Sequence, residues 1–122
     1  MQEPYFVKHK GQSILCIDLS NSRLADKAEY FEILQLAKKI IARQPPKSVL
    51  TFTNVQGSQF DREIVKELKE YTKHNRPYVK KAAIMGIEGL QATIYLAVMK
   101  FSKRNIPLFD DKESALDWLV EP

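Results

Sequence analysis

The run Ser13-Ile14-Leu15-Cys16-Ile17-Asp18-Leu19 is nearly continuous in apolar residues. Such a run is typical of a β-strand that is covered on both faces. Residues 5–9 predict a strand before it, and Lys10-Gly11-Gln12 between the two has the length and the glycine of a hairpin turn. The chain is therefore expected to begin with an antiparallel pair of strands, over 5–9 and 13–19.

Beyond Leu19, helical and strand patterns alternate along the chain. Apolar residues at helical spacing predict helices over 26–43 and 60–75, each followed by proline. Further patterns predict strands over 48–55, within 78–87 and over 106–109, and helices over 88–101 and 111–120. Strands that alternate with helices usually pair in parallel through right-handed crossovers. We therefore expect an α/β fold with a mixed five-stranded sheet, antiparallel only at its first hairpin, and four helices.

The composition is that of one globular domain, covering residues 1–122. Hydrophobic residues make up 44% of the chain and charged residues 28%, which excludes a disordered or fibrous protein. No apolar run is long enough to span a bilayer, and Met1-Gln2-Glu3-Pro4 does not open a signal peptide, so we expect a cytoplasmic protein. The net charge of +4 is spread along the chain and gives no strong signal for nucleic acid. The single Cys16 lies where a small core residue is expected.

The order of elements, together with one motif near the end, resembles the STAS domains, which have the fold of the anti-sigma-factor antagonists. The motif is Phe109-x-x-x-x-x-Ala115-x-x-Trp118-Leu119, which is similar to the C-terminal signature of the SpoIIAA-like branch. The resemblance covers nearly the whole chain in element order, and the motif concerns packing rather than chemistry. It implies a non-enzymatic regulatory module that works by protein–protein contact.

In antagonists of this fold, a serine in an Asp-Ser-Ser/Thr-Gly motif is phosphorylated at the start of the helix after the third strand. The matching stretch here is Phe60-Asp61-Arg62-Glu63, so Asp61 aligns with the motif and Arg62 stands at the acceptor position. The resemblance therefore implies a partner or switch loop, with Asn54, Ser58, Asp61 and Arg62 as its candidate residues, that lacks the usual acceptor serine. Ser58-x-x-Asp61 is also an ordinary helix start, and we expect capping by Ser58 rather than its modification.

In open α/β sheets, ligands collect at the carboxyl edge of the parallel strands, and here that edge carries polar residues without a catalytic arrangement. The residues expected there are Asp18, Ser20, Asn21, Thr53, Asn54, Ser58, Glu88 and Asp110. Both histidines, His9 and His74, are expected elsewhere, so no Ser/His/Asp or Cys/His site can form. The four glycines form no phosphate-binding motif. We therefore expect no enzyme activity, no cofactor and no metal, with Mg²⁺ held by Asp18, Glu88 and Asp110 as the weaker alternative.

The helix over 88–101 is more apolar than a surface helix needs to be. One stripe at helical spacing is formed by Leu90, Ile94, Ala97, Val98 and Phe101. Beside that stripe lie Tyr95, Leu96 and Met99, which are candidates for an apolar interface or ligand face. Three interpretations stay open: core packing of a wide helix, a homodimer face, and a site for an apolar ligand or a membrane surface.

A strongly basic stretch, Lys73-His74-Asn75-Arg76-Pro77-Tyr78-Val79-Lys80-Lys81, precedes this helix, and Lys100, Lys103 and Arg104 end it. These cations are expected near the amino edge of the sheet, where they could meet anionic lipid or nucleic acid, although a solvated face is more common.

The sequence leaves two functions to consider. The first is a regulatory module that contacts a protein partner or a second copy of itself. The second is a carrier or sensor of an apolar small molecule or lipid, since the SpoIIAA-like branch also resembles lipid-transfer folds in element order.

Overall fold

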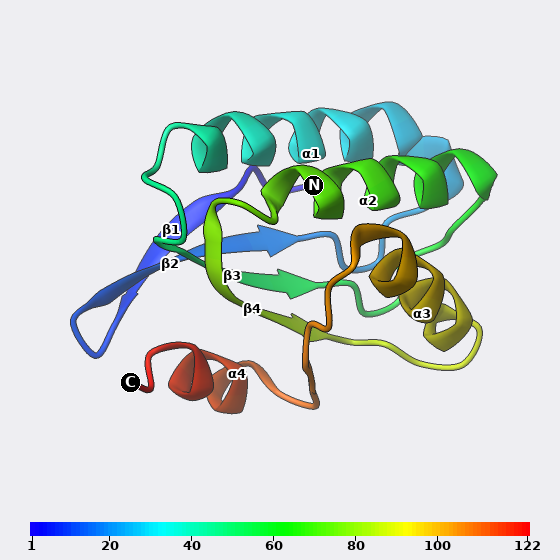
Figure 1. Ribbon diagram of the computed structural model, residues 1–122. Helices are drawn as coiled ribbons and strands as arrows, with labels where there is room; N and C mark the ends of the chain where they lie inside the picture. The colour runs from blue at the N-terminus through cyan, green and yellow to red at the C-terminus, as the bar shows by residue number, and fades with distance from the viewer.

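Five strands form one sheet in the order β1-β2-β3-β4-β5 in the computed structural model, which describes residues 1–122 (Figure 1). The strands are β1 (Tyr5–His9), β2 (Gln12–Asp18), β3 (Val49–Asn54), β4 (Val79–Met85) and β5 (Leu108–Phe109). β1 runs antiparallel to β2, with Val7 opposite Ile14, and the other pairs are parallel. The predicted α/β fold, with a mixed sheet that is antiparallel only at its first hairpin, is confirmed.

The last strand is shorter than the predicted strand over 106–109. Pro107 has no N–H with which to join a strand ladder. The Ile106 N–H lies 3.2 Å from the sulfur of Met99 instead, although the Pro107 carbonyl still accepts a hydrogen bond from the Ile84 N–H at 3.1 Å. Regular pairing of β5 with β4 therefore begins only after Pro107.

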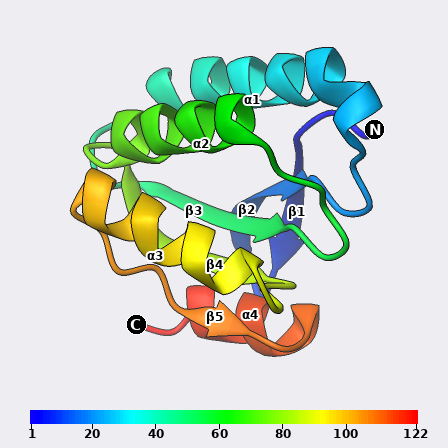
Figure 2. The same cartoon turned by 90° about the vertical axis from the view of Figure 1, so that its right-hand side faces the viewer.

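Four α-helices cover the two faces of the sheet unequally. They are α1 (Lys27–Ala42), α2 (Arg62–Asn75), α3 (Gln91–Ser102) and α4 (Lys112–Leu119), with a 3-10 turn η1 (Leu24–Asp26) before the first. α1, α2 and α3 cover one face, and α4 lies alone on the other (Figures 1 and 2). None of the helices has both the length and the apolar character that crossing a membrane requires.

β2 is buried on both faces, as its sequence predicts. Leu15 and Ile17 belong to the larger core, beneath α1, α2 and α3, whereas Ile14 and Cys16 belong to the smaller core, beneath α4. All four side chains are at most 1% exposed. Burial raises the pKa of the Cys16 thiol, as expected for a cysteine that packs as a small apolar residue.

The loop between β4 and α3 shifts the start of the third helix. The sequence predicts a helix from residue 88, whereas α3 begins at Gln91. Gly86 and Gly89 have φ values of +95° and +55°. A right-handed helix cannot include residues in this left-handed region, so it forms only after Gly89.

Candidate functional site

The loop between β3 and α2 is anchored by Asp61. Its carboxylate oxygen Oδ1 accepts a hydrogen bond from the Ile64 N–H at 2.9 Å and caps the N-terminus of α2. The same carboxylate forms an ion pair with Lys27 at the start of α1. Lys27 and then the Ile64 N–H hold the pKa of Asp61 below its usual value. Asp61 therefore ties two neighbouring helices together at the carboxyl edge of the sheet.

The other residues of the predicted switch loop have separate structural tasks. Ser58 is only 7% exposed, and its hydroxyl donates to the carbonyl of Leu19. The expectation that Ser58 caps α2 is therefore wrong, because the cap is Asp61. Asn54 accepts a hydrogen bond from the Gln56 N–H at 3.0 Å and stabilises the turn after β3. Arg62 is exposed on the first turn of α2.

α3 lies on the sheet with a different face from the predicted stripe. Val98 and Met99 are buried, but Leu90 is 87% exposed and Phe101 is 42% exposed. Ala97 of the predicted stripe is exposed as well. Three of the five residues of the predicted stripe are therefore exposed, and the buried face of the helix is centred on Val98 and Met99.

The three residues predicted as an apolar face are divided between the two sides of α3. Tyr95 is half-buried, and its hydroxyl donates to the carbonyl of Ile106. Met99 also points inward, and its sulfur accepts the Ile106 N–H described above. Leu96 points outward and is 64% exposed. These two contacts with Ile106 fix the rotation of the helix about its axis.

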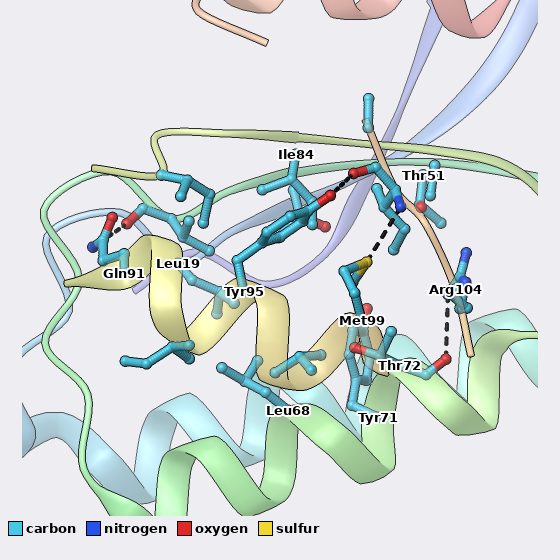
Figure 3. A pocket seen from close by; sticks show the side chains of 18 of the residues that line it. Leu19, Thr51, Leu68, Tyr71, Thr72, Ile84, Gln91, Tyr95, Met99 and Arg104 are labelled. Carbon is cyan, nitrogen blue, oxygen red and sulfur yellow. Dashed lines mark hydrogen bonds between the residues drawn. The ribbon is translucent and has the colours of Figure 1, made fainter. Parts of the chain in front are cut away.

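A cavity of about 80 Å³ lies between α2, α3 and the sheet (Figure 3). Gln91 lies at one end of α3 and donates to the Ser58 carbonyl at 3.1 Å, while Arg104 lies just beyond the other end. The lining is mainly apolar and includes Leu19, Val55, Phe60, Leu68, Ala82, Ile84, Ile87, Ile94, Tyr95, Val98, Met99 and Ile106. Two of the predicted apolar-face residues, Tyr95 and Met99, therefore line a cavity and do not face solvent.

Two polar side chains of this cavity are incompletely bonded. The hydroxyl of Tyr71 on α2 is buried and has no hydrogen-bond partner. Burial raises the pKa of Tyr71 to about 12. The side chain of Asn75, which lies near the hydroxyl without the geometry of a hydrogen bond, and the charge of Arg104 act in the opposite direction. The Arg104 guanidinium donates to the Thr72 carbonyl at 3.2 Å and forms no ion pair. Burial lowers the pKa of Arg104.

A basic pocket of about 270 Å³ opens at the amino edge of the sheet, next to this cavity. Its charged residues are Lys47, Arg76, Lys80, Lys81 and Arg104. The two hollows share three lining residues, Ala82, Arg104 and Ile106, and therefore lie side by side. Most of these cations come from the basic segments that the sequence placed at this edge, and Lys47 from the turn before β3 joins them.

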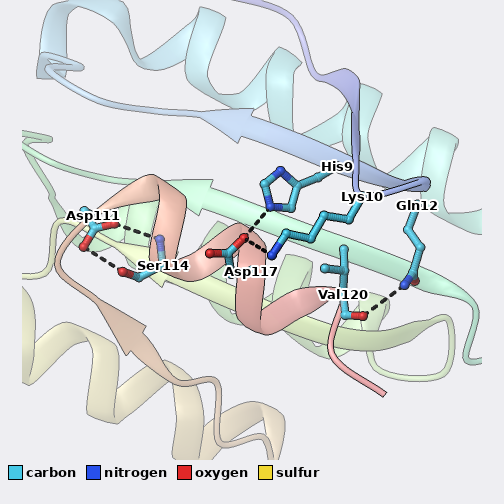
Figure 4. A network of polar contacts seen from close by, with 7 residues as sticks. All are labelled: His9, Lys10, Gln12, Asp111, Ser114, Asp117 and Val120. Carbon is cyan, nitrogen blue, oxygen red and sulfur yellow. Dashed lines mark hydrogen bonds and ion pairs between the residues drawn. The ribbon is translucent and has the colours of Figure 1, made fainter.

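Both histidines lie away from the carboxyl edge of the sheet. Nε2 of His9 lies 2.7 Å from the Asp117 carboxylate, which also pairs with Lys10 at 3.1 Å (Figure 4). His9 and then Lys10 lower the pKa of Asp117. This cluster joins the β1–β2 hairpin to α4. His74 lies 3.0 Å from the Asn75 side chain at the end of α2.

The acidic residues of the carboxyl edge form no metal site. Asp18 accepts hydrogen bonds from both the N–H and the hydroxyl of Ser20, at 3.0 and 2.6 Å. No three His, Cys, Asp or Glu side chains come together in a way that could hold a metal ion. The alternative of Mg²⁺ bound by Asp18, Glu88 and Asp110 is therefore wrong.

Sequence reasoning missed the unpaired polar groups at the amino end of the cavity. In the sequence, Tyr71 lies at helical spacing within the predicted helix over 60–75, and Arg104 is one of the cations at the end of the predicted helix over 88–101. The signal that could have separated Arg104 from the exposed lysines was the run Asn105-Ile106-Pro107 after it, which leads directly into the sheet.

Comparisons of the chain with protein-family models, curated proteins and solved structures gave no match.

Proposed function

We propose that the chain is a STAS-like regulatory module that has no catalytic role and acts through protein–protein contact at the outer face of α3. The order of the five strands, the N-terminal hairpin and the four helices are consistent with that fold. The outer face of α3, with the residue that precedes the helix, consists of Leu90, Ala92, Thr93, Leu96, Ala97, Lys100 and Phe101. The exposure of its large apolar side chains is the observation that carries the proposal.

This face is unusually apolar for a surface in water. Burial of a leucine is worth about 1.5–3 kcal/mol relative to its exposure, and Leu90 and Leu96 are 87% and 64% exposed. Lys100 is the only charged residue of the face. Phe101 lies at the C-terminal end of this face, and the Lys69 and Lys73 ammonium groups each lie 5.7 Å from the centre of its ring. A partner would therefore gain most from contact around Leu90 and Leu96.

The outer face is continuous with the loop that the STAS resemblance implicates in partner binding. A groove of about 410 Å³ runs between the Gly57–Phe60 segment and the first turn of α3. Its apolar lining is Phe60, Leu90 and Ile94. The loop and the helix would thus present one surface to a partner, with Arg62 beside it rather than a phosphorylatable serine.

A second copy of the chain is the partner to test first. The outer face has no acidic residue that would select a basic partner, and the small residues Ala92, Thr93 and Ala97 would let two helices approach closely. Light scattering over a wide range of protein concentration should show a mass that rises towards that of a dimer. Leu96→Asp should keep the protein monomeric, because a buried unpaired carboxylate opposes association.

The matched control is Leu36→Asp on α1, which also replaces an exposed leucine but lies on another helix. It should leave the dimerisation unchanged. A wild-type protein that stays monomeric at every concentration would overturn self-association at α3, as would equal loss of the dimer in both variants.

The cavity under α3 favours a second candidate function, the binding of an apolar small molecule. A cavity of 150 Å³ is known to accept benzene, so about 80 Å³ holds roughly three carbon atoms without rearrangement. A long lipid chain does not fit this space. Chemical-shift changes in Val98 and Ile84 methyl groups on addition of 1-propanol would support this function. The cavity-filling variant Val98→Phe should abolish them.

A further inference from the structure

We propose that the cavity and the basic pocket together form one site for a phosphate monoester with a short apolar tail. The inference rests on the second candidate function, because it requires the cavity to accept the tail. It adds a charged head group, which would lie in the basic pocket on the other side of Arg104. The chemical class of the ligand is therefore a small amphiphilic dianion.

Arg104 lacks the counter-charge that a partly buried arginine needs. A guanidinium has five N–H donors in a planar fork, and the only hydrogen bond of the Arg104 guanidinium goes to the Thr72 carbonyl at 3.2 Å. No carboxylate lies within ion-pair distance of it. Charged groups that are removed from water are normally paired. An anion that accepts two parallel hydrogen bonds from the free side of the fork would complete this site.

The residues around Arg104 favour a phosphate over a carboxylate. Lys47, Arg76, Lys80 and Lys81 line the same pocket, no acidic side chain lines it, and none of the four forms an ion pair. Lys47 donates to the Arg76 carbonyl at 2.9 Å and Lys81 to the Trp118 carbonyl at 2.5 Å, which leaves their positive charges uncompensated by any anion. A phosphate monoester carries a charge of about −1.5 to −2 at neutral pH. One such group balances several of these cations at once.

The cavity supplies the place for the tail. Arg104 and Ile106 belong to the lining of both hollows, so a head group bound beside Arg104 in the basic pocket lies next to the apolar space of the cavity. Tyr71 adds a buried hydroxyl without a partner on the cavity side. An ester oxygen that enters between the two hollows could accept a hydrogen bond from it. The cavity volume limits the tail to about three carbons.

The experiment measures binding by isothermal titration calorimetry with three probes: propyl phosphate, inorganic phosphate and 1-propanol. Propyl phosphate should bind at least about tenfold more tightly than inorganic phosphate, because each buried methylene group favours binding. Arg104→Gln should weaken the binding of propyl phosphate about tenfold or more, since it removes the positive charge and the paired N–H donors of the guanidinium. Arg104→Lys keeps the charge, and we expect an intermediate affinity. Tyr71→Phe should weaken propyl phosphate several-fold and leave inorganic phosphate unchanged.

Lys39→Gln on the exposed side of α1 is the control for a change in net charge and should have no effect. Circular dichroism of each variant confirms that it is folded, and Arg76→Gln gives a second test of the pocket if Arg104→Gln does not fold. Equal affinity for propyl phosphate and inorganic phosphate would overturn the proposal, because the tail would then lie outside the cavity. Binding of 1-propanol without binding of either phosphate would also overturn it but keep the second candidate function. Failure of all three probes would overturn both.

Discussion

The Cα of Gly86 lies against the backbone of Gln56, so close that a Cβ at position 86 would overlap the Gln56 nitrogen. The same residue has φ +95°, a conformation that side chains rarely adopt. This approach joins the loops after β3 and β4 at the carboxyl edge of the sheet. Gly86→Ala should therefore lower the free energy of unfolding by about 3 kcal/mol or more, through steric overlap and backbone strain together.

Gly89 is the matched control for this prediction. It also has a positive φ, +55°, but a Cβ there would meet no atom within 4 Å. Gly89→Ala should cost only about 1 kcal/mol, from backbone strain alone. Urea unfolding of both variants measures the difference. Equal destabilisation would show that the contact with Gln56 adds nothing to the strain.

Asp61 has two roles that substitution can separate. Asp61→Ala should lower the free energy of unfolding most, because it removes both the cap of α2 and the ion pair with Lys27. Asp61→Ser keeps a capping oxygen without the charge, and its stability should lie between those of wild type and Asp61→Ala. Added salt should narrow the gap between wild type and Asp61→Ser, because salt screens the ion pair and not the cap.

The pH dependence of Asp61 gives an independent check. The pKa of Asp61 is lower in the folded protein than in the unfolded chain, where it is about 3.9. The charged carboxylate therefore stabilises the fold at pH values above the unfolded pKa, and this stabilisation is lost as the pH falls through the pKa of the folded protein. The advantage of wild type over Asp61→Asn should therefore shrink below about pH 4. A constant difference across this range would contradict the ion-paired role.

Ser58 tests whether the loop could work through phosphorylation at that position. Its buried hydroxyl donates to the Leu19 carbonyl, so Ser58→Ala should cost about 1 kcal/mol. Ser58→Asp should cost about 3 kcal/mol or more, because it places an unpaired carboxylate against a carbonyl oxygen in the interior. Thermal unfolding compares the two. An aspartate variant as stable as wild type would mean that the loop opens easily and could present Ser58 to a kinase.

The architecture could be predicted because each element carries its own pattern. The apolar run through β2 required cover on both faces, and the hairpin glycine fixed the direction of β1. The rotation of α3 could not be predicted in the same way. Its apolar residues are spread around most of the circumference of the helix, so their periodicity does not indicate which face is buried. The contacts of Tyr95 and Met99 with Ile106, which lies in the segment after the helix, decide which side is buried.

The basic pocket could not be predicted because it depends on three segments meeting in space. Lys47 precedes β3, Arg76 follows α2 and Arg104 follows α3. Each is an ordinary turn cation when read alone. The sequence does place these turns at one edge of a parallel sheet, but the burial of Arg104 and its lack of an acidic partner are properties of the packed side chains only. The same holds for the unpaired hydroxyl of Tyr71.

The tyrosines make the stability of the fold sensitive to alkaline pH. Burial raises the pKa values of Tyr30, Tyr71 and Tyr95, and that of Tyr71 reaches about 12. Because the folded state favours the neutral phenol, the buried tyrosines add stability that is fully present below the unfolded pKa of about 10. This stability is lost as the pH rises through the pKa values of the folded protein. The free energy of unfolding should therefore fall steeply between about pH 10 and 12.

Tyr71→Phe isolates the contribution of one phenol to this fall. At neutral pH the variant should be as stable as wild type or up to about 1 kcal/mol more stable, because the lost hydroxyl is buried without a partner. Above about pH 10 its stability should decline less steeply than that of wild type, since one fewer buried phenol loses its proton on unfolding. Denaturant unfolding at a series of pH values measures both effects. Identical slopes in the two proteins would mean that folding does not raise the pKa of Tyr71. A large loss of stability at neutral pH would mean that the Tyr71 hydroxyl has a hydrogen-bond partner in the folded protein.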